Sequence, residues 1–228
     1  MLKVNKCTNN LYRSVYSPFI KVSGQTMLNK VFISTLLVKY FRGYIMARNT
    51  SLTGREVYFN DDDIIVSKTD LKGRLTYCND VFLSIAGYKE DECLGQQHSM
   101  IRHPDMPRCI FQLLWDTIQN GTELFAYVIN RCKNGDHYWV YAHVTPSFDT
   151  AGKIIGFHSN RRIPNKQVLT DTIIPLYEKL KSEEDRAGSR KEGLQRSSQL
   201  IAAMLAKQGV EYDEWVLTLG SNRTHLAA

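Results

Sequence analysis

Residues 98–107, with the sequence HSMIRHPDMP, hold the densest group of side chains that could do chemistry. Two histidines, an arginine and an aspartate precede the second of two prolines. A metal site is weakly supported, because His98 and His103 stand five residues apart and no second group of ligands follows. A hydrolytic triad lacks a GxSxG nucleophile turn. Haem held by a single histidine remains an open alternative.

Part of this segment has a purely structural explanation. The two prolines keep the residue before each of them away from the helical conformation, and Asp105 is predicted to cap the helix that follows. This leaves His98, Arg102 and His103 unexplained ahead of a strongly apolar helix. A buried or half-buried arginine needs an anionic or acceptor-rich partner. The sequence therefore suggests an oxygen-rich ligand.

The charge of the chain is unevenly distributed. Its 228 residues carry a formal net charge of +6, and residues 1–45 contain seven lysines and arginines but no acidic residue. Subtracting these seven charges from +6 leaves −1 for the rest of the chain. This nearly neutral part gives no electrostatic reason to expect nucleic-acid binding. A hydrophobic content of 43% is enough for a packed core.

The cysteines and the basic residues 1–45 give indications about the cellular compartment of the protein. Five cysteines without a CxxC pair argue against a disulfide framework and a zinc site, so we expect a reducing cytoplasm. Residues 1–45 are expected to form a loose arm or to lie upstream of a start at Met46, with an interfacial membrane anchor as the alternative. Their apolar run VFISTLLV is well short of the ~20 residues that a spanning helix needs.

From about residue 61 the hydrophobic rhythm predicts regular elements. In chain order they are a hairpin over 64–79 that turns at Lys72-Gly73, a helix over 80–86 capped by Asn79 or Asp80 and ended by Gly87, a helical turn within 89–95, a helix over 108–119, strands over 123–133, 137–148 and 154–163, and helices over 172–184 and 194–207 joined by a polar linker. Two strands, a cluster of helices and three strands predict an α+β fold, with helices on one face of an antiparallel sheet.

Four segments carry a resemblance to a known family. TDLKGRLTYCNDVFLSIAGY, HSMIRHPDMP, LLWDTIQNG and NRCKNGDHYWV occur in this order. Over residues 60–165 they resemble the PAS sensor domain, specifically the FAD-binding PAS domain of bacterial aerotaxis receptors. RHPDMP followed by NRCKNGDHYWV is far more specific than general PAS patterning. The resemblance implies the PAS fold, a five-stranded antiparallel sheet with short helices on one face, here with a C-terminal helical extension over residues 170–228.

The resemblance also implies FAD as the cofactor. The family's binding residues then fall on Asn79, His98, Arg102, His103, Asp105, Trp115 and Asn130. Arg102 and His103 could pair with flavin or phosphate oxygens, and Trp115 could stack on the ring. The two asparagines offer both donors and acceptors. Asp105 is expected to position the loop.

Two departures from the family pattern keep alternatives open. The family often has Trp and Gly near the start of the strand where this sequence has Leu124, which allows a different ligand or an empty pocket. The segment GQQHSMIRHP lacks the cysteine of light-sensing relatives, so no photochemical thiol adduct is expected.

These features predict a flavin-binding redox or oxygen sensor in signal transduction, aerotaxis-like and not an enzyme. Its output would pass to a separate chemoreceptor-type or other signalling protein. The contact is expected through the Trp139/Tyr141 face of strand 137–148 or through the C-terminal helix, and coverage of that face by helix 172–184 is the alternative. A homodimer is possible, and membrane association would come through a partner. The rivals are a haem-binding or cofactor-free interaction module and a flavoenzyme.

Overall fold

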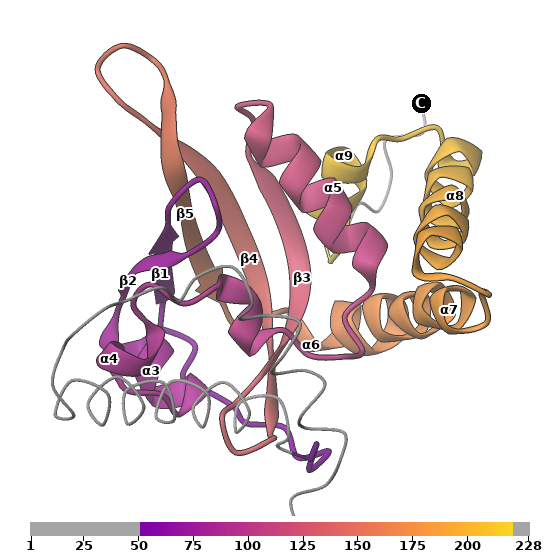
Figure 1. Cartoon of the computed structure of the whole chain (residues 1–228). Coiled ribbons are helices and arrows are strands. Elements are labelled where there is room, and N and C mark those ends of the chain that lie inside the picture. The colour runs from indigo at the N-terminus through magenta and orange to yellow at the C-terminus, as the bar shows by residue number, and fades with distance from the viewer. Residues whose placement is uncertain (1–50, 221–228) are drawn as a thin grey trace, which may run out of the picture. The chain divides into compact units, whose positions relative to one another are not determined.

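The computed structural model describes residues 51–220, and the predictions for residues 1–45 lie outside this range. A five-stranded antiparallel sheet has the order β2-β1-β5-β4-β3 (Figure 1). The strands are β1 (Ile65–Thr69), β2 (Leu75–Cys78), β3 (Leu124–Arg131), β4 (His137–Phe148) and β5 (Ile154–Arg162). The predicted α+β architecture and the order of its elements along the chain are confirmed.

The helices between β2 and β3 cover one face of the sheet. They are α3 (Asp80–Ala86), α4 (Glu90–Cys93), the short 3₁₀ helix η1 (His98–Ile101) and α5 (Arg108–Gln119). Asn79 caps α3 by accepting from the Phe82 N–H, and Gly87 ends it with φ 71°. In α5 the buried residues Ile110, Leu114 and Ile118 recur at helical spacing. These boundaries follow the predicted ones closely.

The two faces of the sheet differ in what covers them. Strand pairing puts Asn130 of β3 on the same face as the predicted set Leu124, Ala126 and Val128, and all four are buried. Because Trp115 of α5 packs edge-on against Phe157 of β5, this is the face beneath the helices. We call it the inner face and the opposite side the outer face.

The C-terminal extension is more helical than the sequence suggested. It contains α6 (Lys166–Val168), a π-helical turn (Leu169–Ile173), α7 (Ile174–Asp185), α8 (Arg190–Gln208) and α9 (Tyr212–Thr218). The predicted linker over 185–193 is too long, because Ser189 caps α8 by accepting from the Glu192 N–H. Helix α9 was not predicted, although its buried Tyr212, Trp215 and Val216 follow an i, i+3, i+4 pattern.

The extension lies beside β3, at the edge of the sheet away from β2 (Figure 1). The Tyr177 hydroxyl of α7 donates to the Tyr127 carbonyl at 2.6 Å, and the Tyr177 ring lies 5.9 Å from that of Trp139. Trp139 is only 8% exposed. The alternative that helix 172–184 covers this residue is therefore confirmed. The expectation that a partner docks directly on Trp139 is wrong, because Tyr177 already packs there. Tyr141 stays half-buried.

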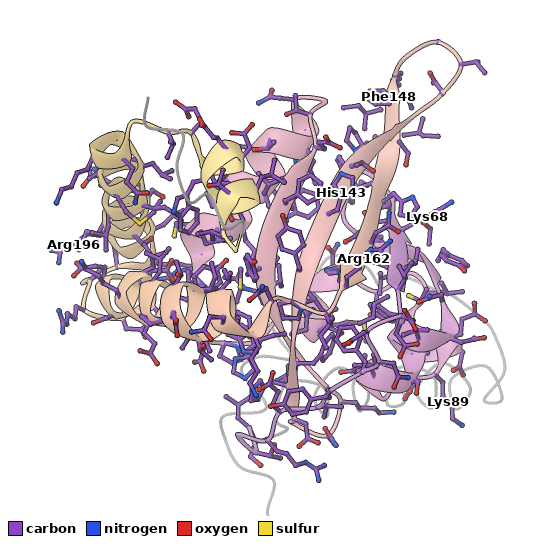
Figure 2. All side chains as sticks on the ribbon, turned by 180° about the vertical axis from the view of Figure 1, so that it is seen from behind. Lys68, Lys89, His143, Phe148, Arg162 and Arg196 are labelled. Carbon is purple, nitrogen blue, oxygen red and sulfur yellow. The ribbon has the colours of Figure 1, made fainter. Side chains whose placement is uncertain are left out.

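The outer face carries a pocket at the level of β4 and β5. Its lining residues are Ile64, Phe125, Tyr141, His143, Asn160 and Arg162. The rings of Phe125 and His143 stack with centroids 4.1 Å apart, and Figure 2 shows His143 and Arg162 from this side. No helix of residues 51–220 is both long enough and apolar enough to cross a membrane.

Candidate functional site

Arg102 organises the loop formed by residues 98–107. It pairs as an isolated β-bridge with Asn130, which joins the loop to β3. Its Nη2 donates to the Met106 carbonyl at 3.1 Å, and its guanidinium lies 4.4 Å from the centre of the Phe111 ring. These contacts close the loop on itself and give the Arg102 guanidinium an acceptor within the loop.

His103 is buried, and its imidazole ring is neutral. The backbone N–H of Asp105 donates to His103 Nδ1 at 3.2 Å, so this nitrogen acts as an acceptor. Burial lowers the pKa of His103, and the Asp105 carboxylate opposes that shift only in part. The Asp105 carboxylate lies 3.5 Å from His103 Nδ1, and the Asp105 side chain is 70% exposed. The expected role of Asp105 in positioning the loop stays a prediction.

The prediction that Asp105 caps the following helix is wrong. Helix α5 begins at Arg108 without a side-chain cap from the residue before it. Instead Glu184, from the C-terminal helix α7, accepts through Oε1 from the backbone N–H groups of Arg108 at 2.6 Å and Cys109 at 3.2 Å. A carboxylate at a helix N-terminus is electrostatically favourable. Because this cap comes from 76 residues further along the chain, local sequence patterns did not reveal it.

Glu184 joins three helices. Its Oε2 accepts from Arg108 Nε at 2.9 Å, and its Oε1 also accepts from the Ser197 hydroxyl of α8 at 3.1 Å. Helix α8 can approach α7 closely at Gly193, which has no side chain. A Cβ at this position would lie 2.6 Å from the Glu184 carbonyl oxygen. The loop, α5 and the extension therefore meet at one buried carboxylate.

Asn79 and Trp115 lie toward β1 and β2. The Asn79 Oδ1 accepts from the Val66 and Phe82 N–H groups, and its Nδ2 donates to the Ile64 carbonyl at 2.7 Å. These bonds occupy the amide in a structural role, and its predicted contact with a cofactor stays untested. Trp115 lies over the turn before β2, where a Cβ on Gly73 would come within 3.0 Å of its ring.

A second arginine, Arg161 of β5, lies inside the inner face. It is 3% exposed. Its Nη2 donates to the Ser67 hydroxyl at 2.7 Å and lies 2.7 Å from His98 Nε2. Burial, with the nearby charge of Arg161, lowers the pKa of His98 to about 3. His98 is therefore neutral and accepts from the guanidinium.

Four buried donors on the inner face have no hydrogen-bond partner within the described part of the chain. They are Asn130 Nδ2, the Tyr138 hydroxyl, the Ser159 hydroxyl and Arg161 Nη1. Asn130 and Tyr138 are paired neighbours on β3 and β4, and Arg161 acts electrostatically on Tyr138. A buried donor without an acceptor costs roughly 1–3 kcal/mol. An acceptor-rich ligand would remove this cost, so the residues present fit the polar edge of a flavin.

Comparison with known proteins agrees with this arrangement. Residues 75–161 match a family model described as the PAS fold. This region has the PAS fold. The aerotaxis receptor of Escherichia coli (strain K12) is 40% identical over 138 residues, which make up 60% of this chain and 25% of that protein. The predicted resemblance to this type of PAS domain is confirmed.

Other relatives are more distant. A nitrogen fixation regulatory protein of Klebsiella pneumoniae is 24% identical over 137 residues, 54% of this chain and 28% of that protein. The chain thus spans about a quarter of the length of these two curated relatives. Among solved structures, the light state of the blue-light photoreceptor Aureochrome1 LOV has a TM-score of 0.43 at 19% identity, covering 54% of this chain and 91% of that one.

Within the region that has the PAS fold, the sequence did not point to Ser67, Tyr138 and Arg161. Strand 154–163 has polar residues on both of its faces near its end, so alternation alone could not tell which arginine points inward. A better signal was the pairing of Arg161 with Ala142, whose small side chain shares the inner face. That pairing requires the register of the sheet.

Proposed function

We propose that this PAS domain binds FAD and acts as a redox or oxygen sensor in signal transduction of the aerotaxis kind. The observation that carries the proposal is the set of four buried, unpartnered donors on the inner face. The similarity to an aerotaxis receptor supports the same conclusion. When bound, FAD would supply reversible electron transfer.

Several side chains would hold the cofactor. Asn130, Tyr138 and Arg161 would donate to its polar edge. Trp115 and Phe157, which meet edge-on with centroids 5.5 Å apart, would pack against its apolar surface. The loop containing Arg102 and His103 would close one side, since its backbone is already joined to Asn130. The predicted binding residues thus gain three neighbours, Ser67, Tyr138 and Arg161.

The output would leave through the C-terminal helices. A change in hydrogen bonding at Asn130 would act on its bridge with Arg102 and on the loop that leads into α5. The start of α5 is held by Glu184 of α7, which also contacts α8. Interfaces of this kind switch between discrete arrangements rather than deforming gradually. We expect a separate signalling protein to contact α7 or α8.

An absorption spectrum of the purified full chain, before and after addition of FAD, tests the proposal. The expected result is a flavin band in the blue that stays with the protein after gel filtration. A haem Soret band would favour the haem-binding alternative, and a colourless protein after reconstitution would overturn FAD binding. Sustained NAD(P)H consumption by the yellow protein would favour the flavoenzyme alternative.

A further inference from the structure

Arg161 is a buried cation without a negatively charged partner. The groups in contact with it are the Ser67 hydroxyl of β1, the neutral His98 ring of η1 and the Phe82 ring of α3, 5.8 Å away. Tyr138 of β4 and Cys78 of β2 act on it electrostatically. None of the carboxylates in residues 51–220 forms an ion pair with it.

Such an arrangement is unfavourable without a ligand. A guanidinium stays charged in proteins, and a buried charge normally needs a partner of opposite sign or a full set of acceptors. Two acceptors satisfy Nη2, whereas Nη1 has none. The position therefore suits a ligand that brings an oxygen acceptor to β5 from inside the fold.

The surroundings of Arg161 distinguish between two parts of a flavin nucleotide. Phosphate groups are strongly hydrated and suit sites open to water, whereas a ring carbonyl can be bound in an apolar interior. Beside Arg161 on the inner face lie its two strand-pairing partners, Ile65 of β1 and Ala142 of β4. Both are at most 2% exposed. Phe82 is fully buried. These neighbours match a flat ring with apolar faces and a polar edge.

We propose that Arg161 recognises the carbonyl edge of the isoalloxazine ring, and that His98 is a positioning residue that holds the guanidinium in place. This inference rests on the proposed binding of a flavin. Arg161 would supply Nη1 to a ring oxygen, while Nη2 stays on His98 and Ser67. The phosphates would be recognised elsewhere.

The test compares two neighbouring arginines in the full chain. Arg161→Met removes the buried guanidinium, and Arg162→Met removes the next one, which is exposed and lines the pocket of the outer face. Dissociation constants for riboflavin, FMN and FAD are measured with each protein by equilibrium dialysis. Because a hydrogen bond to a charged group is lost, Arg161→Met should weaken all three flavins by about 10–100-fold. Arg162→Met should leave all three constants unchanged.

Three results would contradict this inference, and they can be told apart. If Arg161→Met weakens FMN and FAD but not riboflavin, the arginine recognises phosphate. If it binds all three as tightly as the wild type, Arg161 is not a binding residue, although the proposed FAD function stands. If the wild type itself binds none of them, both proposals fail.

A second variant separates binding from folding. Circular dichroism checks that Arg161→Met is folded, and Arg161→Lys provides a variant that keeps the charge if it is not. A lysine lacks the planar fork of donors, so Arg161→Lys should also weaken the three flavins by a common factor, smaller than that of Arg161→Met. Unchanged constants in a folded Arg161→Lys would count against recognition by the fork.

Discussion

His98 shows how a single half-buried group makes the stability of this protein depend on pH. Its Nε2 lies 2.7 Å from Arg161, and burial lowers its pKa from the ordinary 6.5 to about 3. The unfolded chain therefore binds a proton that the folded protein excludes between these two pH values. The resulting contribution to stability is complete above pH 6.5 and is lost as the pH falls toward 3.

The corresponding prediction uses His98→Gln, which keeps an acceptor for Arg161 but does not titrate. Between pH 6 and pH 4 the free energy of unfolding of the wild type should fall by about 2 kcal/mol more than that of His98→Gln. Urea unfolding at the two pH values measures this difference. Other buried groups, such as His103, titrate in both proteins, so their contributions to the fall in the free energy of unfolding cancel in the difference. An equal fall in both proteins would show that His98 does not resist protonation.

The residue types of loop 98–107 stand in the sequence, but which buried arginine has an Nη1 without an acceptor does not. The sequence suggested that Arg102, which lies in the specific motif, needs an acceptor-rich partner. In the structure Arg102 finds its acceptor at Met106, within its own loop. Arg161, more than fifty residues later, keeps an unpaired Nη1. Its position depends on strand register, and register is a property of the whole sheet.

Among the elements, Glu184 connects the region with the PAS fold to its C-terminal extension. The carboxylate is fully buried and holds Arg108, two backbone N–H groups and Ser197. Glu184→Ala would leave a largely buried arginine and two helical donors without their acceptor. We expect the free energy of unfolding in urea to fall by about 3–5 kcal/mol.

Glu183, its neighbour on α7, is the matched control. It contacts Arg186 at 3.9 Å, one turn away on the same helix, and Arg186 is mostly exposed. Glu183→Ala should therefore change the free energy of unfolding by less than about 1 kcal/mol. Similar losses in the two variants would mean that the cap of α5 contributes little.

Elements with local signals were the ones the sequence predicted well. The hairpin turn at Gly73, with φ 73°, and the end of α3 at Gly87 both need a positive φ that glycine adopts readily. The start of α8 was placed too late because Gly193 suggested a linker, whereas it marks close packing against Glu184. Helix α9 is short, and its buried residues need β3 as a neighbour.

At the scale of the whole molecule, the proposed route from cofactor to extension can be followed by hydrogen exchange. Addition of FAD to the full chain should slow amide exchange in residues 98–107. Because Glu184 ties the start of α5 to α7 and α8, exchange should also slow around Ser182–Asp185 and Ser197. Mass spectrometry of peptides from these regions measures both effects.

Glu184→Gln provides the control for this route. It keeps the shape of the side chain but weakens its contacts with Arg108, so FAD should still protect residues 98–107 while its effect on α7 and α8 shrinks. Glu183→Gln should behave like the wild type. If the wild type shows protection of the loop alone, the extension does not receive the signal by this route.

The three tryptophans of the chain are distributed so that each belongs to a different layer. Trp115 faces Phe157 under α5, Trp139 lies against Tyr177 on the opposite side of the sheet, and Trp215 packs with Tyr212 in α9. Replacing two of them by phenylalanine leaves one indole whose fluorescence reports on a single layer. The protein thus carries its own optical labels for the inner face of the sheet, its covered outer face and helix α9.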